Sequence, residues 1–325
     1  MGQELAGWRN LKKDDLLKHR NILLLLLLAS LWGPSFLFIK IAVEDFPPMT
    51  LVAIRLTVAA IVLYTILRVN GKNLPAGWNF WKKFLIMGFF ANALPFTLFS
   101  FGEQFADSGA ASILNGTTPI FTVLIAHFFV FDERLNPSRL GGVLVGFMGI
   151  LLIFFPDFQA LLRGEGFQGG MGTIGLLAFI GAAACYGVGI VFGRLQLRGL
   201  PPLVGPAAQL ICSAGMILPL ALIIERPFHL TPGLPAIGSS LVLGFFGTAM
   251  AYLVYYRLID SAGATFISLV TYLLPPIGVM LGVFFLDEKP GWYSLAGLAL
   301  IILGVMVVNG TVATTWKRIR GLSTA

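Results

Sequence analysis

Long apolar segments alternate with short polar ones along almost the whole chain. A helix needs about 20 mostly apolar residues to cross a hydrocarbon core of about 30 Å. Asp, Pro and Gly gather in the short connections, as turn chemistry requires. The pattern predicts an all-α polytopic membrane protein with ten transmembrane helices, at 22–43, 47–69, 82–101, 109–131, 138–155, 171–195, 202–224, 236–257, 262–285 and 292–312.

The sequence also repeats itself at an offset of about 154 residues. Each copy contains five predicted helices, an odd number, so the second copy enters the membrane from the opposite face. Inverted repeats are typical of transporters, because exchanging the conformations of the two halves gives alternating access to a central site. The matched pairs include Trp32 and Tyr186, Lys40 and Arg194, Arg55 and Gln209, Gly88 and Gly244, Asp107 and Asp260, Glu133 and Glu288, and Gly149 and Gly304.

The repeat divides the chain into two halves with short flanking segments. The basic and apolar N-terminus is similar to a signal peptide, but it lacks a clear cleavage site and is expected to be the first transmembrane helix. We expect a cytoplasmic N-terminal segment at 1–21, a first five-helix repeat at 22–155, a periplasmic linker at 156–170, a second five-helix repeat at 171–312 and a cytoplasmic tail at 313–325.

The composition agrees with a membrane protein. Hydrophobic residues make up 57% of the 325 residues and charged residues only 11%, whereas a soluble domain carries about 25% charged residues. The two cysteines, Cys185 and Cys212, lie inside apolar segments and are expected to be free thiols rather than a disulfide or a metal site. No metal and no other cofactor is predicted.

The net charge of +7 indicates membrane topology rather than nucleic-acid binding. With the N-terminus inside, seventeen Lys and Arg residues fall on the cytoplasmic side and only Arg163, Arg226 and Lys289 fall outside. This asymmetry predicts a multi-pass protein of the bacterial inner membrane with both termini in the cytoplasm. The expected partners are a small-molecule substrate and the lipid bilayer, and we expect a monomer that binds no nucleic acid.

Polar and aromatic residues accompany helix-breaking residues near the middle of several predicted helices. A proline within a helix frees a backbone carbonyl, which in lipid must be satisfied by protein, water or a ligand. The simpler alternative is that the small residues are packing surfaces and each proline is a kink. As a set, the midplane residues are predicted to line a substrate cavity; they are Trp32, Asn92, Phe96, Asn115, Tyr186, Thr248, Tyr252, Ser268 and Tyr272.

Two basic side chains are candidate charge partners or gating groups. Arg55 lies within a span and needs a partner, because burying a guanidinium costs at least a few kcal/mol. A substrate carboxylate, Glu44, Glu103 and backbone carbonyls are the candidates, and pairing within the protein is the favoured interpretation. His127 lies late in the fourth span, where a buried, hydrogen-bonded histidine is favoured over a proton carrier.

The acidic residues lie at the ends of the predicted spans. Asp107, Asp260 and the Asp-Glu pairs at 132–133 and 287–288 are expected to be solvated helix caps. Because no acid lies near the middle of a span, the usual carboxylate proton relay is not visible. We therefore expect facilitated diffusion or weakly coupled exchange; proton coupling would have to run through His127 or an interfacial acid.

Several short motifs occur in a fixed order and in duplicate. They are Trp32-Gly33 with Phe36, the Asp107-Ser108 stretch leading to Pro119, Asp132-Glu133 followed by Gly142 and Gly149, and the second copy of each. Their order resembles the EamA family of the drug/metabolite transporter superfamily. The resemblance covers about 22–312 and implies a basket of helices around a central cavity, lined by spans one, three, four, six, eight and nine. Within that superfamily the chain is most similar to bacterial exporters of aromatic and other neutral amino acids.

The leading functional hypothesis is an exporter of aromatic and other neutral amino acids that works by alternating access. An exporter of drugs or organic cations would need an intramembrane carboxylate, and purine or sugar export is the other alternative within the superfamily. A membrane-embedded lipid enzyme would need clustered catalytic groups, but the histidines are scattered at 19, 127 and 229. The broken helices form no obvious charged ring or filter, which disfavours a channel. The protein is therefore predicted not to be an enzyme.

Overall fold

The computed structural model describes residues 19–130, 137–156, 159, 170–197, 200, 203–262, 264–267 and 269–308. All regular elements in these ranges are helices, and the ranges contain no strand. The elements are α2 (Ser35–Ala42), α3 (Pro48–Val69), α4 (Trp78–Gly88), η1 (Phe89–Ala93), α5 (Leu94–Gly102), α6 (Ser108–Asn115), α7 (Thr118–Phe129), α8 (Pro137–Ile153), α10 (Gly170–Gln196), α11 (Val204–Leu220), η2 (Ala221–Glu225), η3 (Pro227–His229), α12 (Leu234–Gly244), η4 (Phe245–Met250), α13 (Ala251–Ala262), α14 (Ala264–Ile267), α15 (Val270–Leu286) and α16 (Trp292–Val308).

Several of these elements join into longer helices that can cross a membrane. The described residues form seven such helices, namely His19–Ala42, Pro48–Val69, Trp78–Gly102, Ser108–Phe129, Met171–Gln196, Val204–Glu225 and Leu234–Leu258. Three shorter apolar helices, α8, α15 and α16, accompany them. Large apolar side chains such as Phe128 and Phe284 are mostly exposed, as expected for a surface that faces lipid. The chain is a multi-pass, all-helical membrane protein.

Irregular turns interrupt the long helices near their middles. Gly33–Pro34 forms a turn within the first helix, and Gly116–Thr117 forms another directly before α7. The helix Trp78–Gly102 contains the π-helix η1, and the helix Leu234–Leu258 contains the π-helix η4. A π-turn shifts hydrogen bonds from the fourth to the fifth residue and often occurs at functional sites. Because these breaks lie near the middle of the long helices, they coincide with the positions at which the sequence predicts a cavity.

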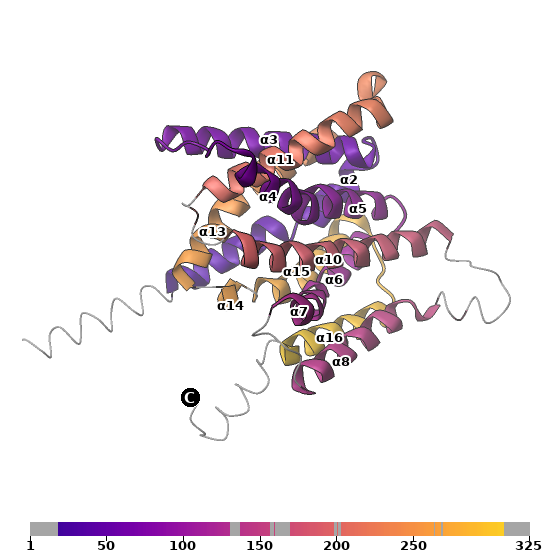
Figure 1. Cartoon of the computed structure of the whole chain (residues 1–325). Helices are drawn as coiled ribbons and strands as arrows, with labels where there is room; N and C mark the ends of the chain where they lie inside the picture. Colours follow the sequence, from indigo (N-terminus) through magenta and orange to yellow (C-terminus); the bar gives the residue numbers. More distant parts are fainter. Residues whose placement is uncertain are drawn as a thin grey trace, which may run out of the picture.

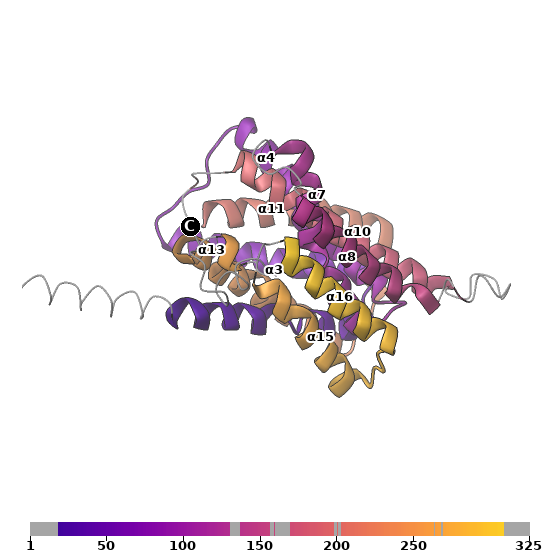
Figure 2. The same cartoon turned by 90° about the horizontal axis from the view of Figure 1, so that it is seen from below.

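Glycines bring α8 and α16 into close contact at the edge of the molecule (Figures 1 and 2). A Cβ atom at Gly142 would lie 2.7 Å from the carbonyl oxygen of Gly304, and one at Gly149 would lie 2.7 Å from that of Gly297. Real Cβ atoms do not approach so closely, so only glycine allows this helix spacing. The pair lies beside α7, at the periphery that the family resemblance implies for the last helix of each repeat.

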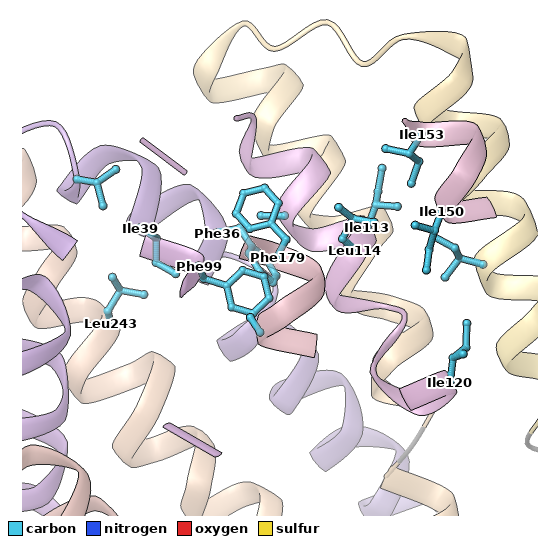
Figure 3. Close-up of a cluster of buried hydrophobic side chains, with 14 of the residues drawn as sticks. Phe36, Ile39, Phe99, Ile113, Leu114, Ile120, Ile150, Ile153, Phe179 and Leu243 are labelled. Carbon is cyan, nitrogen blue, oxygen red and sulfur yellow. The ribbon is translucent and has the colours of Figure 1, made fainter. Parts of the chain in front are cut away.

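Aromatic rings fill the core between α2, α5 and α10 (Figure 3). The Phe36 and Phe99 rings meet edge to face with centroids 5.5 Å apart, and Phe99 stacks on Phe179 at 5.6 Å. Such pairs contribute about 0.5–1.5 kcal/mol beyond the burial of their area. Because α10 belongs to the second half of the chain, this core joins the two halves.

Candidate functional site

Arg55 is a charged residue buried in the middle of α3. It is only 5% exposed and lies among apolar residues on the inner face of the helix. Its Cζ lies 3.9 Å from the centroid of the Phe96 ring, a cation–π contact, and its Nε donates a hydrogen bond to Thr248 Oγ1 at 2.8 Å. Among the described residues, neither terminal amino group of Arg55 has a hydrogen-bond acceptor.

Thr248 is oriented toward Arg55 by the π-turn in which it lies. Its hydroxyl donates to the carbonyl of Leu243, five residues earlier, at 2.9 Å. With its proton directed there, the oxygen presents a lone pair to the Arg55 Nε–H. A fully buried hydroxyl thus both satisfies a backbone group of the irregular turn and holds one edge of the guanidinium.

A second polar network lies in the other π-turn. Asn92 Nδ2 donates to the hydroxyl of Tyr252 at 2.6 Å, and Gln209 Nε2 donates to Asn92 Oδ1. Gln209 Nε2 also lies 3.3 Å from the Tyr252 hydroxyl. These bonds satisfy the buried amides, and they leave the Tyr252 hydroxyl proton without an acceptor among the described residues.

The two networks occupy matching positions in the sequence repeat. Arg55 on α3 bonds to Thr248 in η4, while its counterpart Gln209 on α11 bonds to Asn92 in η1. Asn92 and Thr248 are themselves counterparts, because each lies four residues after the matched glycine of a Gly-Phe-Phe motif. Each contact therefore crosses from one half of the chain to the other.

Those matched glycines, Gly88 and Gly244, allow the π-turns to approach the opposite helices. A Cβ at Gly88 would lie 2.9 Å from the carbonyl oxygen of Gln209, and one at Gly244 would lie 3.1 Å from that of Arg55. A larger residue at either position would separate the helix that supplies the donor from the turn that supplies its partner.

Aromatic side chains surround the two networks. The Phe96 and Tyr186 rings meet with centroids 6.4 Å apart, and Tyr252 lies 6.5 Å from Tyr255. Trp32 reaches the same group through Tyr255, at 5.5 Å. The structure therefore brings together the predicted residues Trp32, Asn92, Phe96, Tyr186, Thr248 and Tyr252.

The remaining predicted site residues lie in other surroundings. Asn115 ends α6, where its carbonyl accepts a hydrogen bond from Thr118 Oγ1 at 2.8 Å. Tyr272 packs against the hydrophobic cluster that includes Phe36 and Phe99, and the His127 ring lies 5.1 Å from that of Phe128 near the end of α7. Ser268 lies outside the described residues.

In the described residues, Arg55 contacts groups that the prediction does not name. The guanidinium is paired within the protein with the Thr248 hydroxyl and the Phe96 ring, while Glu103 acts on it electrostatically without a hydrogen bond. Glu44 is exposed. A hydroxyl balances a hydrogen-bond donor but not a charge, so the buried positive charge still lacks a bonded anion.

Gln209 and Tyr255 are site residues that the sequence prediction missed. Gln209 could have been found from the repeat, since it aligns with the selected Arg55. Tyr255 lies three residues after Tyr252, close to one helical turn, and so shares much of its face. Depth alone had not marked either residue. The described residues include no group of three His, Cys, Asp or Glu side chains that could hold a metal ion.

Two grooves in the structure have linings that do not include Arg55, Asn92, Gln209 or Thr248. The smaller, about 280 Å³, is lined by Pro34, Phe38 and Val242 with their neighbours. The larger, about 460 Å³, is lined by Thr50, Thr57 and other residues near α3 and η2. Apolar side chains dominate both linings, and Arg55 faces neither, so we do not assign the polar networks to them.

Carboxylates at a helix end and in connecting segments join the two halves near the ends of the helices. Glu225 accepts hydrogen bonds from the Met49 and Thr50 amides, at 2.9 and 2.6 Å, and from the Thr50 hydroxyl at 2.6 Å. Asp45 accepts one from the Gly233 amide at 2.7 Å. Each bond joins one half to the other and satisfies amides that helices or turns leave unpaired.

Glu288 forms a third such contact, which corrects the expectation of solvated caps. It is partly buried and accepts hydrogen bonds from the Ser108 and Gly109 amides at the start of α6. Asp107, the N-cap residue itself, makes no side-chain cap bond. For the other acids the expectation stays a prediction. The pair at 132–133 lies outside the described residues, and the side chain of Asp260 is not described.

Comparison with known proteins agrees with the duplicated helical architecture. The EamA-like transporter family matches residues 19–155 and, a second time, residues 173–310. A protein of known crystal structure shares the fold with a TM-score of 0.63 at 21% identity, over 89% of this chain and 97% of that one. The two family matches together cover most of the chain.

Relatives of similar length are also transporters. The uncharacterized transporter YoaV of Bacillus subtilis is 27% identical over 281 residues, which cover 85% of this chain and 92% of that protein. A probable amino-acid metabolite efflux pump of Salmonella typhimurium is 25% identical over 297 residues, covering 87% and 93%. The names indicate transporters and not enzymes, as predicted. This chain belongs to the EamA-like transporter family.

Proposed function

We propose that this protein exports aromatic and other neutral amino acids across the bacterial inner membrane. The observation that carries the proposal is the buried Arg55, whose terminal amino groups lack acceptors among the described residues, within a group of aromatic side chains from both halves. An aromatic amino acid supplies a carboxylate that can bind the guanidinium and a ring that can pack against these aromatic side chains.

The carboxylate would bind to Arg55 and Tyr252. A guanidinium presents parallel N–H donors that match the two oxygens of a carboxylate, and such charged bonds are about twice as strong as neutral ones. Tyr252 lies four residues after Thr248 in the same long helix, so it shares the face that holds Arg55. Its hydroxyl accepts from Asn92 and keeps its own proton available for donation.

The apolar part of the substrate would lie against Phe96, Tyr186, Trp32 and Tyr255. Aromatic rings prefer edge-to-face or offset contacts with other rings, and several of these pairs are already tilted. We also assign Asn115, Ser268 and Tyr272 to the substrate pathway, because they are predicted to lie near the middle of their spans. His127 would be a gating or structural residue near the end of α7.

The transport cycle would exchange the roles of two inverted repeats. Two matched contacts support this cycle, Arg55 with Thr248 and Gln209 with Asn92. Equivalent contacts in the two halves are expected if the halves exchange conformations during transport. The three shorter apolar helices would complete ten spans in the proposed topology, with repeats at 22–155 and 171–312 and both termini in the cytoplasm.

Other cargoes fit the site less well. A drug or organic cation would be repelled by the positive charge of Arg55, and Glu103, an acid that acts electrostatically on Arg55, is fully buried. A purine or a neutral sugar has no carboxylate to offset the cost of the buried guanidinium. The amino-acid efflux pump among the relatives of this chain points in the same direction.

Counterflow in proteoliposomes tests the proposal. Vesicles loaded with unlabelled phenylalanine should take up labelled phenylalanine, and three competitors separate the chemical requirements. Tryptophan should compete well, 3-phenylpropionate should retain part of the competition because it keeps the carboxylate, and phenethylamine should compete at least about tenfold more weakly. Competition by phenethylamine equal to that by phenylalanine would contradict a carboxylate site at Arg55.

A further inference from the structure

Glu103 is a buried acid at the end of α5. Its side chain is 0% exposed, and both carboxyl oxygens are buried with no hydrogen-bond donor among the residues that the structure describes. Buried polar atoms are almost always hydrogen-bonded, and a buried carboxylate without donors is particularly costly. This residue therefore calls for an explanation beyond packing.

Lys40 lies beside Glu103 but is bonded elsewhere. Its Nζ donates to the backbone carbonyl oxygens of Glu103 and Ala106, at 2.6 and 2.9 Å. The ammonium group therefore fastens α2 to the turn between α5 and α6. It contributes positive potential near the Glu103 carboxyl, without a hydrogen bond to it.

The same turn leads directly into the contact between Glu288 and α6. Glu288 Oε1 accepts from the Ser108 amide at 2.7 Å, and Oε2 accepts from the Gly109 amide at 2.9 Å. Asp287 adopts a left-handed conformation with φ of 53°, which ends α15 and turns the chain toward α6. A Cβ atom at Gly282 would overlap the Glu288 carboxylate, so the carboxylate occupies space that this glycine leaves. We call this contact the Glu288 clasp.

Charged groups face Glu103 from several elements. Lys40 comes from α2, Arg55 from α3 and Glu288 from the segment after α15, while Asp107 in the connecting turn interacts with Lys40 and Glu288. The adjoining Gly102 packs against Phe179 and Gly175 of α10, which bring no charge. Burial raises the pKa of Glu103 well above its usual value; Lys40 and Arg55 oppose this shift and Glu288 adds to it.

We infer that Glu103 is a proton-binding site that controls the Glu288 clasp between the two halves. A protonated Glu103 is neutral and can stay in its buried position while the clasp is closed. When the proton leaves, the new carboxylate needs water and is repelled by Glu288, so the turn moves outward and α6 separates from Glu288. The ligand of this site is a proton, which binds to the Glu103 carboxyl at the end of α5.

The direction of the pH effect follows from linkage. If the pKa of a carboxyl group is higher in the closed clasp than in the open one, the group stabilises the closed clasp, and this effect is complete at pH values below its ordinary pKa. This preference is lost as pH rises through the raised value. Partial burial also raises the pKa of Asp107, Glu288 adds to this, and Lys40 opposes it. Because Asp107 is exposed whereas Glu103 is fully buried, Glu103 carries the pH dependence and favours a closed clasp at low pH and an open one at high pH.

Hydrogen exchange of the Ser108 and Gly109 amides reads the clasp without any substrate. The full-length protein in lipid nanodiscs is compared between about pH 5 and about pH 8 with the Glu103→Gln variant. After correction for intrinsic exchange, wild-type protection should fall by about tenfold or more as pH rises, and E103Q should remain protected throughout. An equal fall in both proteins would overturn the inference.

Two further variants make the exchange experiment decisive. Glu44→Gln removes an exposed acid in the turn that follows α2, and this variant should behave as wild type. Glu288→Gln should lose protection at Ser108 and Gly109 at every pH, because the amide accepts only one of the two bonds well. Wild-type protection in E288Q would overturn the inference, because the clasp would then not hold these amides.

A transport assay separates this inference from the proposed function on which its role in the cycle rests. Counterflow of labelled phenylalanine should depend on pH in wild type and should be slow and independent of pH in E103Q. Equal pH dependence in the two proteins would contradict the control by Glu103. If no variant moves any amino acid while the exchange results hold, the substrate assignment fails and the proton site stands.

Discussion

Arg55 and Gln209 hold equivalent positions in the two halves, and each donates a hydrogen bond to a π-turn of the other half. The chemistry at the two positions differs, since one is a charged guanidinium and the other a neutral amide. Of these two matched positions, only the one in the first half carries a cation. This asymmetry gives a zwitterionic substrate one preferred orientation in the site.

Arg55 should be required for transport of carboxylate substrates. Arg55→Gln removes the charge and should lower the initial rate of phenylalanine counterflow by about a hundredfold, since a charged, desolvated contact contributes about 2–5 kcal/mol. Arg55→Lys keeps the charge but not the paired donors, and should retain a small fraction of the rate. Arg68→Gln on the exposed last turn of the same helix is the control and should transport normally. Normal rates in R55Q would remove Arg55 from the site.

Thr248→Val should destabilise the protein although it preserves the shape of the side chain. The valine cannot accept from Arg55 Nε or donate to the Leu243 carbonyl, and unpaired buried groups cost about 1–3 kcal/mol each. Thermal unfolding in detergent should therefore begin at a lower temperature. Thr57→Val is the matched control, because the Thr57 hydroxyl is buried without a partner and its loss should be neutral or stabilising. Equal effects of the two substitutions would refute the role of the Thr248 hydroxyl.

Gly304→Ala should push α8 and α16 apart. A methyl group at Gly304 would lie within 3.0 Å of the Gly146 amide and the Gly142 carbonyl oxygen, both of which are backbone atoms. Overpacking of this kind typically costs about 1–3 kcal/mol. Gly141→Ala provides the control on the same helix pair, because no atom lies within 4 Å of its added methyl. Thermal unfolding should show a loss for G304A and a small gain for G141A, since alanine favours helix by about 0.5–1 kcal/mol.

Glu225→Ala should loosen the start of α3. The substitution leaves the Met49 and Thr50 amides without the acceptor that now satisfies them, and losing such a cap typically costs about 1 kcal/mol. Hydrogen exchange should become faster at these two amides. The Ser108 and Gly109 amides, which Glu288 holds, serve as an internal control and should keep their wild-type protection. Unchanged exchange at Met49 and Thr50 would show that Glu225 does not hold the helix start.

Part of the candidate site could be predicted because depth in a membrane is visible in the sequence. Counting from the ends of apolar segments selected Trp32, Asn92, Tyr186, Thr248 and Tyr252 as midplane residues, and the structure brings these into one neighbourhood. Depth does not determine the direction in which a side chain points. For that reason Tyr272 and Asn115, chosen by the same rule, lie among other residues.

The partners of charged residues were the least predictable feature. Glu44 and Glu103 are near Arg55 in sequence or in expected depth, yet its hydrogen bond goes to Thr248, 193 residues away along the chain. Glu288 likewise bonds to amides about 180 residues away. Helix packing brings such groups together, and the sequence carries no local signal for contacts of this range.

The sequence by itself determined the membrane class and the duplicated helical unit, because both follow from the length, order and repetition of apolar segments, and the order of its short motifs pointed to the family. Only the tertiary structure decided which groups meet. It joined Arg55 to Thr248 and Phe96, placed Gln209 against Asn92, and left the Glu103 carboxyl buried without a donor. The physical reason is that hydrophobicity acts along each helix separately, whereas hydrogen bonds and charges act between helices that only the packed fold brings close.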